Sequence, residues 1–316
     1  MSLLSTGCLV LTGCDEKERK DARTLLGGIA GSLSQSPLFQ NDIPFHKRFK
    51  WNAEDFFDDP KVIALCRAIE AKDLREIDRL IANGSDANAL GKDNMTPLLW
   101  AFPTQDLAVF TKILKAGADP NVQITSDFGV NLGNDSRIQS GMSVMELAAI
   151  TFMQGYFEAV MKHGGDPNLV SKVPGEPDTP LHSIAKHRYW SDNDGRIIEH
   201  AKLLLDAGAN INAVSQHGTP ITVAVTRERA NLAVFLLEAG ADWEIVPEPL
   251  EFVAEEGFHY RRIPPTLLHE VLRIKDKERP DVKIEVYDKL ILLLEAKGVD
   301  FDKVREEREQ YHQRWR

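Results

Sequence analysis

One stretch of the chain decides the fold: it opens with Thr179-Pro180-Leu181-His182, continues as a helical segment and closes with Gly208-Ala209-Asn210-Ile211-Asn212. A threonine can cap a helix, a proline fits the first helical position, and a glycine ends a helix in the left-handed conformation. The same order of residues returns in variant form, with openings and closes at Thr96-Pro97-Leu98, Gly117-Ala118-Asp119-Pro120-Asn121, Thr219-Pro220-Ile221 and Gly240-Ala241-Asp242. The sequence therefore predicts a stack of helix pairs.

The closing glycines set the register of this stack. Their spacings are 33, 47, 44, 32 and 58 residues, counted between Gly84, Gly117, Gly164, Gly208, Gly240 and Gly298. Units of about 33 residues with these opening and closing motifs resemble the ankyrin repeat. The resemblance implies an all-α repeat solenoid of about six helix pairs over residues 61–302. It also implies a cap over residues 38–60 and a short final cap helix over residues 303–316.

Surplus residues identify the irregular parts of the stack. Between repeats, long intervals predict two projecting fingers, which we call the first finger (122–142) and the second finger (244–265). Within repeats four and six, extra residues lie between the two helices, at about 187–196 and 275–283.

The core and the caps follow from residue size and polarity. Small residues recur where inner helices approach each other closely, at Ala101, Ala148, Ala149, Ala185 and Ala224. A solenoid must cover the apolar faces of its end units, and aromatic residues crowd the first cap. These aromatic residues are Phe39, Phe45, Phe49, Trp51, Phe56 and Phe57.

The net charge of −10 and the pI of about 5.4 argue against a nucleic acid or an anionic membrane surface as the main partner. An acidic surface can steer a basic protein toward it, although solubility alone also explains the charge. The basic and aromatic segment 46–51 is interpreted as part of the cap, with its rings packed inward.

The three cysteines form no disulfide framework, and Cys66 is expected to be a small buried residue. Leu11-Thr12-Gly13-Cys14 resembles a bacterial lipobox. The resemblance implies a signal segment over residues 1–14, a lipid on Cys14 and a flexible tether over residues 15–37. It places the protein in the periplasm, and Asp15 favours the inner membrane over the outer one. Only 13 residues, none of them Lys or Arg, precede Cys14, so a cytosolic protein without a lipid remains the alternative.

Motifs of catalysis and of metal or cofactor binding are missing from the sequence, which has no His-Glu-x-x-His, Gly-x-Ser-x-Gly, Walker or dinucleotide pattern. We therefore expect that the protein is not an enzyme and that it binds neither a metal nor a cofactor. His182 is expected to bond back to the cap residue Thr179, and His163 and His200 are expected at the surface.

The hollow formed by the inner helices and the finger tips is where such stacks hold partners. In the second finger, aromatic residues inside a charged rim are typical of a protein-binding hot spot, unless they fold back onto the stack. The first finger, rich in Gly, Asn, Ser and Asp, is expected to be mobile until a partner binds. The predicted partner-binding residues are Met95, Phe128, Met142, Asp178, Lys186, His187, Tyr189, Trp190, Arg227, Glu251, Phe252, Glu255, Glu256, Phe258, Tyr260 and Arg273.

Together the repeats and the lipobox resemble bacterial ankyrin lipoproteins. These include immunity proteins that neutralise a delivered toxin, such as a phospholipase effector of a type VI secretion system. The resemblance implies a non-catalytic module that occludes a basic partner protein and contacts the membrane only through its lipid. The alternative is a cytoplasmic scaffold or a secreted effector with no anchor. An unrecognised enzyme is a third, weaker possibility.

Overall fold

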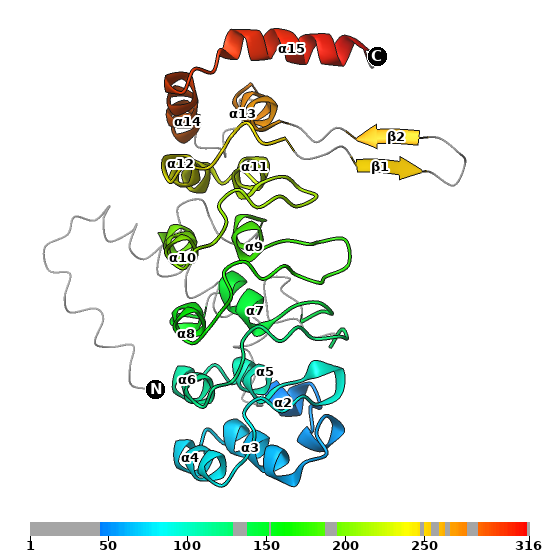
Figure 1. Ribbon diagram of the computed structural model, residues 1–316, viewed down its shortest axis with the longest axis vertical. Coiled ribbons are helices and arrows are strands. Elements are labelled where there is room, and N and C mark those ends of the chain that lie inside the picture. The colour runs from blue at the N-terminus through cyan, green and yellow to red at the C-terminus, as the bar shows by residue number, and fades with distance from the viewer. Residues whose placement is uncertain are drawn as a thin grey trace, which may run out of the picture.

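The computed structural model describes residues 45–128, 138–151, 153–186, 195–246, 250–253, 259–262, 266–276 and 284–314. Within these ranges, two layers of helices stack pair upon pair into an elongated solenoid (Figure 1). The predicted all-α repeat architecture is confirmed. No helix in the described ranges is both long and apolar enough to span a bilayer.

Each repeat contributes one inner and one outer helix. The inner helices are α3 (Pro60–Glu70), α5 (Pro97–Ala101), α7 (Val144–Ile150), α9 (Pro180–Lys186), α11 (Pro220–Thr226) and α13 (Leu267–Lys275). The outer helices are α4 (Leu74–Ala82), α6 (Leu107–Lys115), α8 (Tyr156–Lys162), α10 (Gly195–Asp206), α12 (Ala230–Glu238) and α14 (Ile284–Ala296). Short 3₁₀ turns, η2 (Lys92–Asn94) and η3 (Phe102–Thr104), flank α5. The extra residues of repeats four and six lie between α9 and α10 and between α13 and α14, mostly outside the described residues.

The helix boundaries follow from the local chemistry. The hydroxyl of Thr96 accepts a hydrogen bond from the backbone N–H of Leu99 at 3.1 Å, and Ser143 caps α7 in the same way. All six closing glycines have φ between 84° and 98°, the left-handed region that a side chain disfavours. The chain therefore turns out of each outer helix at a residue fixed by its sequence.

An asparagine four residues after each of the first four closing glycines links one repeat to the next. Asn168 donates from Nδ2 to the carbonyl oxygen of Gly208 at 2.9 Å, and its Oδ1 accepts from the backbone N–H of Asn210 at 2.7 Å. Asn88 and Asn121 make the same pair of bonds to their following repeats, and Asn212 accepts from the N–H of Asp242. We call this series the asparagine ladder.

The core runs without interruption along the stack between the two layers. The five alanines expected at close helix contacts are all fully buried. Cys66 is buried in α3, as predicted. His200, expected at the surface, is instead a buried residue of α10, and its Nδ1 lies 3.1 Å from the carbonyl oxygen of Ala149. That contact crosses between repeats, so the local sequence carries no sign of it.

The N-terminal cap consists of α2 (Phe45–Arg48), the 3₁₀ turn η1 (Ala53–Asp55) and the residues around them. Trp51 is buried, and its ring lies 5.6 Å from that of Trp100 in α5. His46 is also buried, with Nε2 2.9 Å from the carbonyl oxygen of Trp100, and burial lowers its pKa to about 4. These two aromatic rings of the cap thus pack toward α5, whereas 38–44, the tether and the segment holding Cys14 lie outside the described residues.

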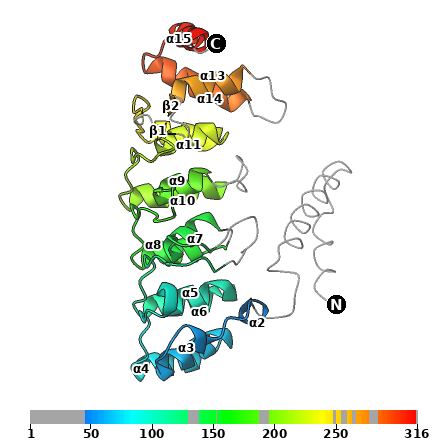
Figure 2. The ribbon, with the colours of Figure 1, turned by 90° about the vertical axis from the view of Figure 1, so that its right-hand side faces the viewer.

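The last helix, α15 (Phe301–Arg314), lies across the C-terminal end of the stack and is seen end-on in Figure 2. Within this helix, Phe301 and Val304 are buried, and Arg308 forms an ion pair with Asp276 at 2.7 Å. A helix is therefore present at the end of the stack, and it begins two residues earlier than the sequence suggested.

The two fingers differ in how they meet the stack. At the base of the first finger, the N–H of Ile124 donates to the carbonyl oxygen of Met142 at 2.9 Å. The ring of Phe128 lies 5.5 Å from that of Trp51 and 5.8 Å from that of Phe56. The described base of the first finger thus packs against the cap, and the mobility expected for this finger stays a prediction.

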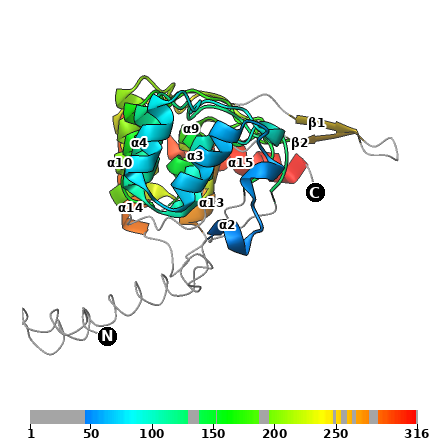
Figure 3. The same ribbon diagram turned by 90° about the horizontal axis from the view of Figure 1, so that it is seen from below.

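In the second finger, β1 (Leu250–Val253) and β2 (His259–Arg262) pair antiparallel. This hairpin projects away from the helices near α11 and α13, beyond the outline of the stack when the molecule is viewed along its length (Figure 3).

Replacing Asn168 by alanine should lower the free energy of unfolding by about 1–3 kcal/mol, because two hydrogen bonds between repeats are lost. The matched variant Asn168→Asp keeps the acceptor but loses the donor to Gly208, so its loss should be smaller. Urea unfolding followed by circular dichroism measures both. Equal stability of wild type and Asn168→Ala would contradict the role assigned to the ladder.

Candidate protein-binding surface

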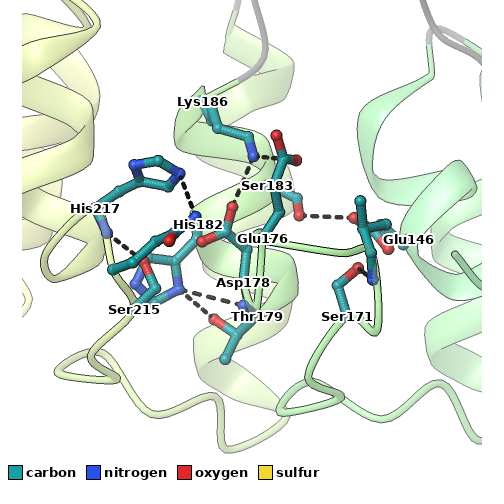
Figure 4. A network of polar contacts seen from close by, with 12 residues as sticks. Glu146, Ser171, Glu176, Asp178, Thr179, His182, Ser183, Lys186, Ser215 and His217 are labelled. Carbon is teal, nitrogen blue, oxygen red and sulfur yellow. Dashed lines mark hydrogen bonds and ion pairs between the residues drawn. The ribbon is translucent and has the colours of Figure 1, made fainter. Parts of the chain in front are cut away.

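A cluster of polar side chains lies in the middle of the stack, where α7, α9 and the loop 171–178 meet (Figure 4). At its centre is Lys186, the last residue of α9. Its Nζ donates to Oε2 of Glu176 at 2.7 Å and to Oδ2 of Asp178 at 2.8 Å. Lys186 is half-buried, so the two carboxylates hold an ammonium group that is partly removed from water.

The charges of Lys186 and Asp178 support each other. Burial alone would raise the pKa of Asp178, but the hydrogen bond and charge of Lys186 outweigh it and lower that pKa. Burial alone would lower the pKa of Lys186, and the bonds to Asp178 and Glu176 raise it instead. Because removing Lys186 would leave the buried carboxylate of Asp178 without its cation, the pair acts as a fixed part of the fold.

His182 connects this cluster to the following repeat. Its Nδ1 lies 2.8 Å from the hydroxyl of Thr179, as the sequence predicted, and its Nε2 lies 3.0 Å from the carbonyl oxygen of Gly218. Burial lowers the pKa of His182, which favours the neutral form of the ring. The imidazole therefore spans two repeats as a structural bridge.

Glu146, in the first turn of α7, is the member of the cluster that the sequence reasoning missed. The hydroxyl of Ser183 donates to its Oε1 at 3.2 Å. Burial raises the pKa of Glu146 from its ordinary value of 4.5 to about 7, against the opposing effects of Ser171, Ser183 and the charge of Lys186. Its position three residues after the cap Ser143 is a sequence signal for a bond back to that cap, but its partners come from the next repeat.

Three of the predicted partner-binding residues are buried, and for them the prediction is wrong. Met95 is 0% exposed, Met142 is 4% exposed and Asp178 is 2% exposed. Each directly precedes the residue that opens an inner helix, a position we took to face the hollow. This position instead packs beneath the turn, where it has little access to a partner.

Four other predicted residues are placed by the structure in different settings. Phe128 is half-buried against the cap, Lys186 is held by two carboxylates, and Arg273 donates from Nε to Oε2 of Glu270 at 2.7 Å. Arg227, which follows α11, is exposed. Only Arg227 among these four thus lies at the surface without a described ion pair.

The remaining predicted residues belong to the second finger and to the insert of repeat four. On the hairpin, Phe252 pairs with Tyr260 and Glu251 pairs with Arg261. The others lie outside the described residues: His187, Tyr189, Trp190, Glu255, Glu256 and Phe258. Their part in binding stays a prediction. In the described part of the chain, no three His, Cys, Asp or Glu side chains are grouped to hold a metal ion.

Comparison with known proteins identifies the repeat type. Residues 178–216, which include α9 and α10, match the ankyrin repeat family. Protein lin-12 of Caenorhabditis elegans is 36% identical over 70 residues, which make up 22% of this chain and 5% of that protein. The chain therefore contains an ankyrin repeat, a unit that generally binds other proteins, and it spans only a small part of that relative.

Replacing Glu146 by glutamine should stabilise the protein at high pH. A carboxyl group whose pKa is raised in the folded state destabilises that state progressively as the pH rises from 4.5 through 7. At pH 8 the variant should gain about 2–3 kcal/mol in the free energy of unfolding, and at pH 4.5 it should match the wild type.

Urea unfolding at several pH values measures this difference. The control Glu158→Gln, which removes the same charge from an exposed position on α8, should show no comparable dependence on pH. A constant difference between Glu146→Gln and the wild type from pH 4.5 to pH 8 would show that Glu146 is not the titrating group.

Proposed function

We propose that this chain is a non-catalytic protein-binding module that acts by occluding its partner. The observation that carries the proposal is the projecting β1–β2 hairpin, which extends from a rigid stack of helices (Figures 1 and 3). An isolated two-stranded hairpin is only marginally stable in water. A partner that covers the hairpin would stabilise it by adding apolar contact.

The composition of the hairpin supports contact with a protein. Its backbone register sets Phe252 opposite Tyr260 and, in the adjacent pair along the strands, Glu251 opposite Arg261. Aromatic anchors surrounded by charged residues are typical of interface hot spots. The ankyrin repeat at residues 178–216 belongs to a class of binding units, which agrees with this assignment.

We propose further that Cys14 is lipidated and that the tether 15–37 holds the stack at the periplasmic surface of the inner membrane. The support is the sequence Leu11-Thr12-Gly13-Cys14 and the abrupt change to charged residues after it. In this location the chain would act as an immunity protein that blocks a toxic effector such as a secreted phospholipase. The net charge of −10 suits a toxin with a basic surface.

Replacing residues 250–262 by a Gly-Ser linker should weaken partner binding at least tenfold without lowering the melting temperature, because the hairpin projects from the core. The partner is first obtained by cross-linking in the native cell and mass spectrometry, and the purified complex is then titrated by calorimetry. Unchanged affinity, or a fall in the melting temperature, would show that the hairpin is structural. A captured toxin that stays fully active in the complex would contradict occlusion.

Replacing Cys14 by serine should abolish labelling of the protein with radioactive palmitate and move it from the membrane fraction to the soluble fraction. The anchor proposed here is the lipid on this thiol, so its loss releases the stack. Cys66→Ser, at a buried thiol, is the matched control and should leave labelling unchanged. A wild-type protein that takes up no palmitate would rule out the anchor and leave the binding module itself unaffected.

A further inference from the structure

Aliphatic side chains at one repeated position remain exposed along the stack. Leu90, Val170, Val214 and Val246 are between 49% and 62% exposed. Each lies six residues after the closing glycine of its repeat. We call these four residues the aliphatic row. In the second repeat the same position is held by Gln123. Burying apolar surface is the main source of binding energy, so a row of this kind is a candidate contact surface.

Members of the row are neighbours in space as well as equivalent in sequence. Nε2 of Gln123 donates to the carbonyl oxygen of Val170 at 2.7 Å, which joins this position in two successive repeats. The asparagine ladder holds Asn168 and Asn212, which lie two residues before Val170 and Val214. The turn after each of these closing glycines therefore has the same geometry. Val170, Val214 and Val246 therefore form a continuous line over three repeats, and Val246 lies at the start of the second finger.

Exposed carboxylates run beside the row. Asp86, Asp166, Asp242 and Glu244 stand two or four residues before members of the row, and Asp119 stands four residues before Gln123. The four aspartates each use Oδ1 to accept the backbone N–H two residues later, which fixes their position and leaves the negative charge at the surface. An aliphatic line beside an acidic line is complementary to a partner that presents apolar and basic side chains together.

The distance between neighbouring residues of the row indicates which conformation of a partner segment would fit it. Stacked helices lie about 8–10 Å apart, so successive members of the row are separated by roughly that distance. An α-helix advances about 10.5 Å in seven residues, whereas residues on one face of a β-strand recur every 6.5–7 Å or so. A polyproline helix advances about 9 Å in three residues, but its ligands bind aromatic-lined grooves, and the row contains only Leu and Val.

We propose that the row binds a basic amphipathic α-helix of the partner protein. Apolar residues seven positions apart on the partner helix contact Val170, Val214 and Val246. The lysines or arginines that flank them on that helix face the carboxylates of this chain. This inference rests on the proposed function, for it names the element of the partner that the stack recognises. The bound helix ends beside the second finger, so the row and the hairpin form one contact surface.

The test uses the full chain and a synthetic, fluorescein-labelled helical peptide that carries leucines seven residues apart among lysines and alanines. A scrambled peptide of the same composition is the control. Fluorescence anisotropy should show binding of the first peptide in preference to the second. The double variant Val170→Ser, Val214→Ser should weaken binding by about tenfold for each valine. Leu292→Ser should not, because this leucine is 63% exposed on α14 but lies outside the row.

Equal binding of the two peptides, or equal affinity of the double variant and Leu292→Ser, would overturn the proposal. Tighter binding of a proline-rich peptide with valine at every third position would overturn the helical assignment. The cross-linked partner separates this inference from the proposed function. If the double variant keeps full affinity for that partner while the Gly-Ser replacement of the hairpin loses it, the row is not the site and the binding module stands.

Discussion

The asparagine ladder is the constraint on which the rest of the structure depends. A single amide side chain donates to one backbone group of the following repeat and accepts from another, so it fixes both the distance and the angle between repeats. The turns that hold these asparagines are in turn fixed by left-handed glycines. Because the same pair of bonds recurs, a feature at one position of one repeat is reproduced at nearly constant spacing along the surface. Helix burial supplies the energy of the stack, and the ladder supplies its register.

The repeat architecture could be predicted from the sequence alone because the helices of each repeat begin and end at residues with strong local conformational preferences. Thr96 and Ser143 cap their helices as expected, and His182 bonds to Thr179. Where contacts come from a distant part of the chain, the same reasoning failed. Glu146 receives its hydrogen bond from Ser183, which lies 37 residues away. Local spacing placed Glu146 at a helix cap and gave no sign of a buried carboxyl group with a pKa of about 7.

The wrong prediction that residues directly before the inner helices face the hollow has one physical origin. Met95, Met142 and Asp178 occupy the same position of three repeats, and all three are buried. Two methionines at that position were a signal of burial that we interpreted as exposure. Asp178 is the polar exception, and it is tolerated because Lys186 reaches over from α9 to neutralise it. The repeat therefore uses apolar packing at this point twice and an ion pair once, with the same backbone conformation around the helix start.

The base of the first finger has a consequence for how the protein opens. Stacks of repeats usually fray from their ends, since each unit touches only its neighbours. Here Phe128, from the connection after the second repeat, packs against Trp51 and Phe56 of the cap. The first two repeats are thereby closed into a loop whose ends are held together by aromatic contact. The cap cannot detach without also releasing this connection, so the N-terminal third should open as one cooperative unit in hydrogen exchange.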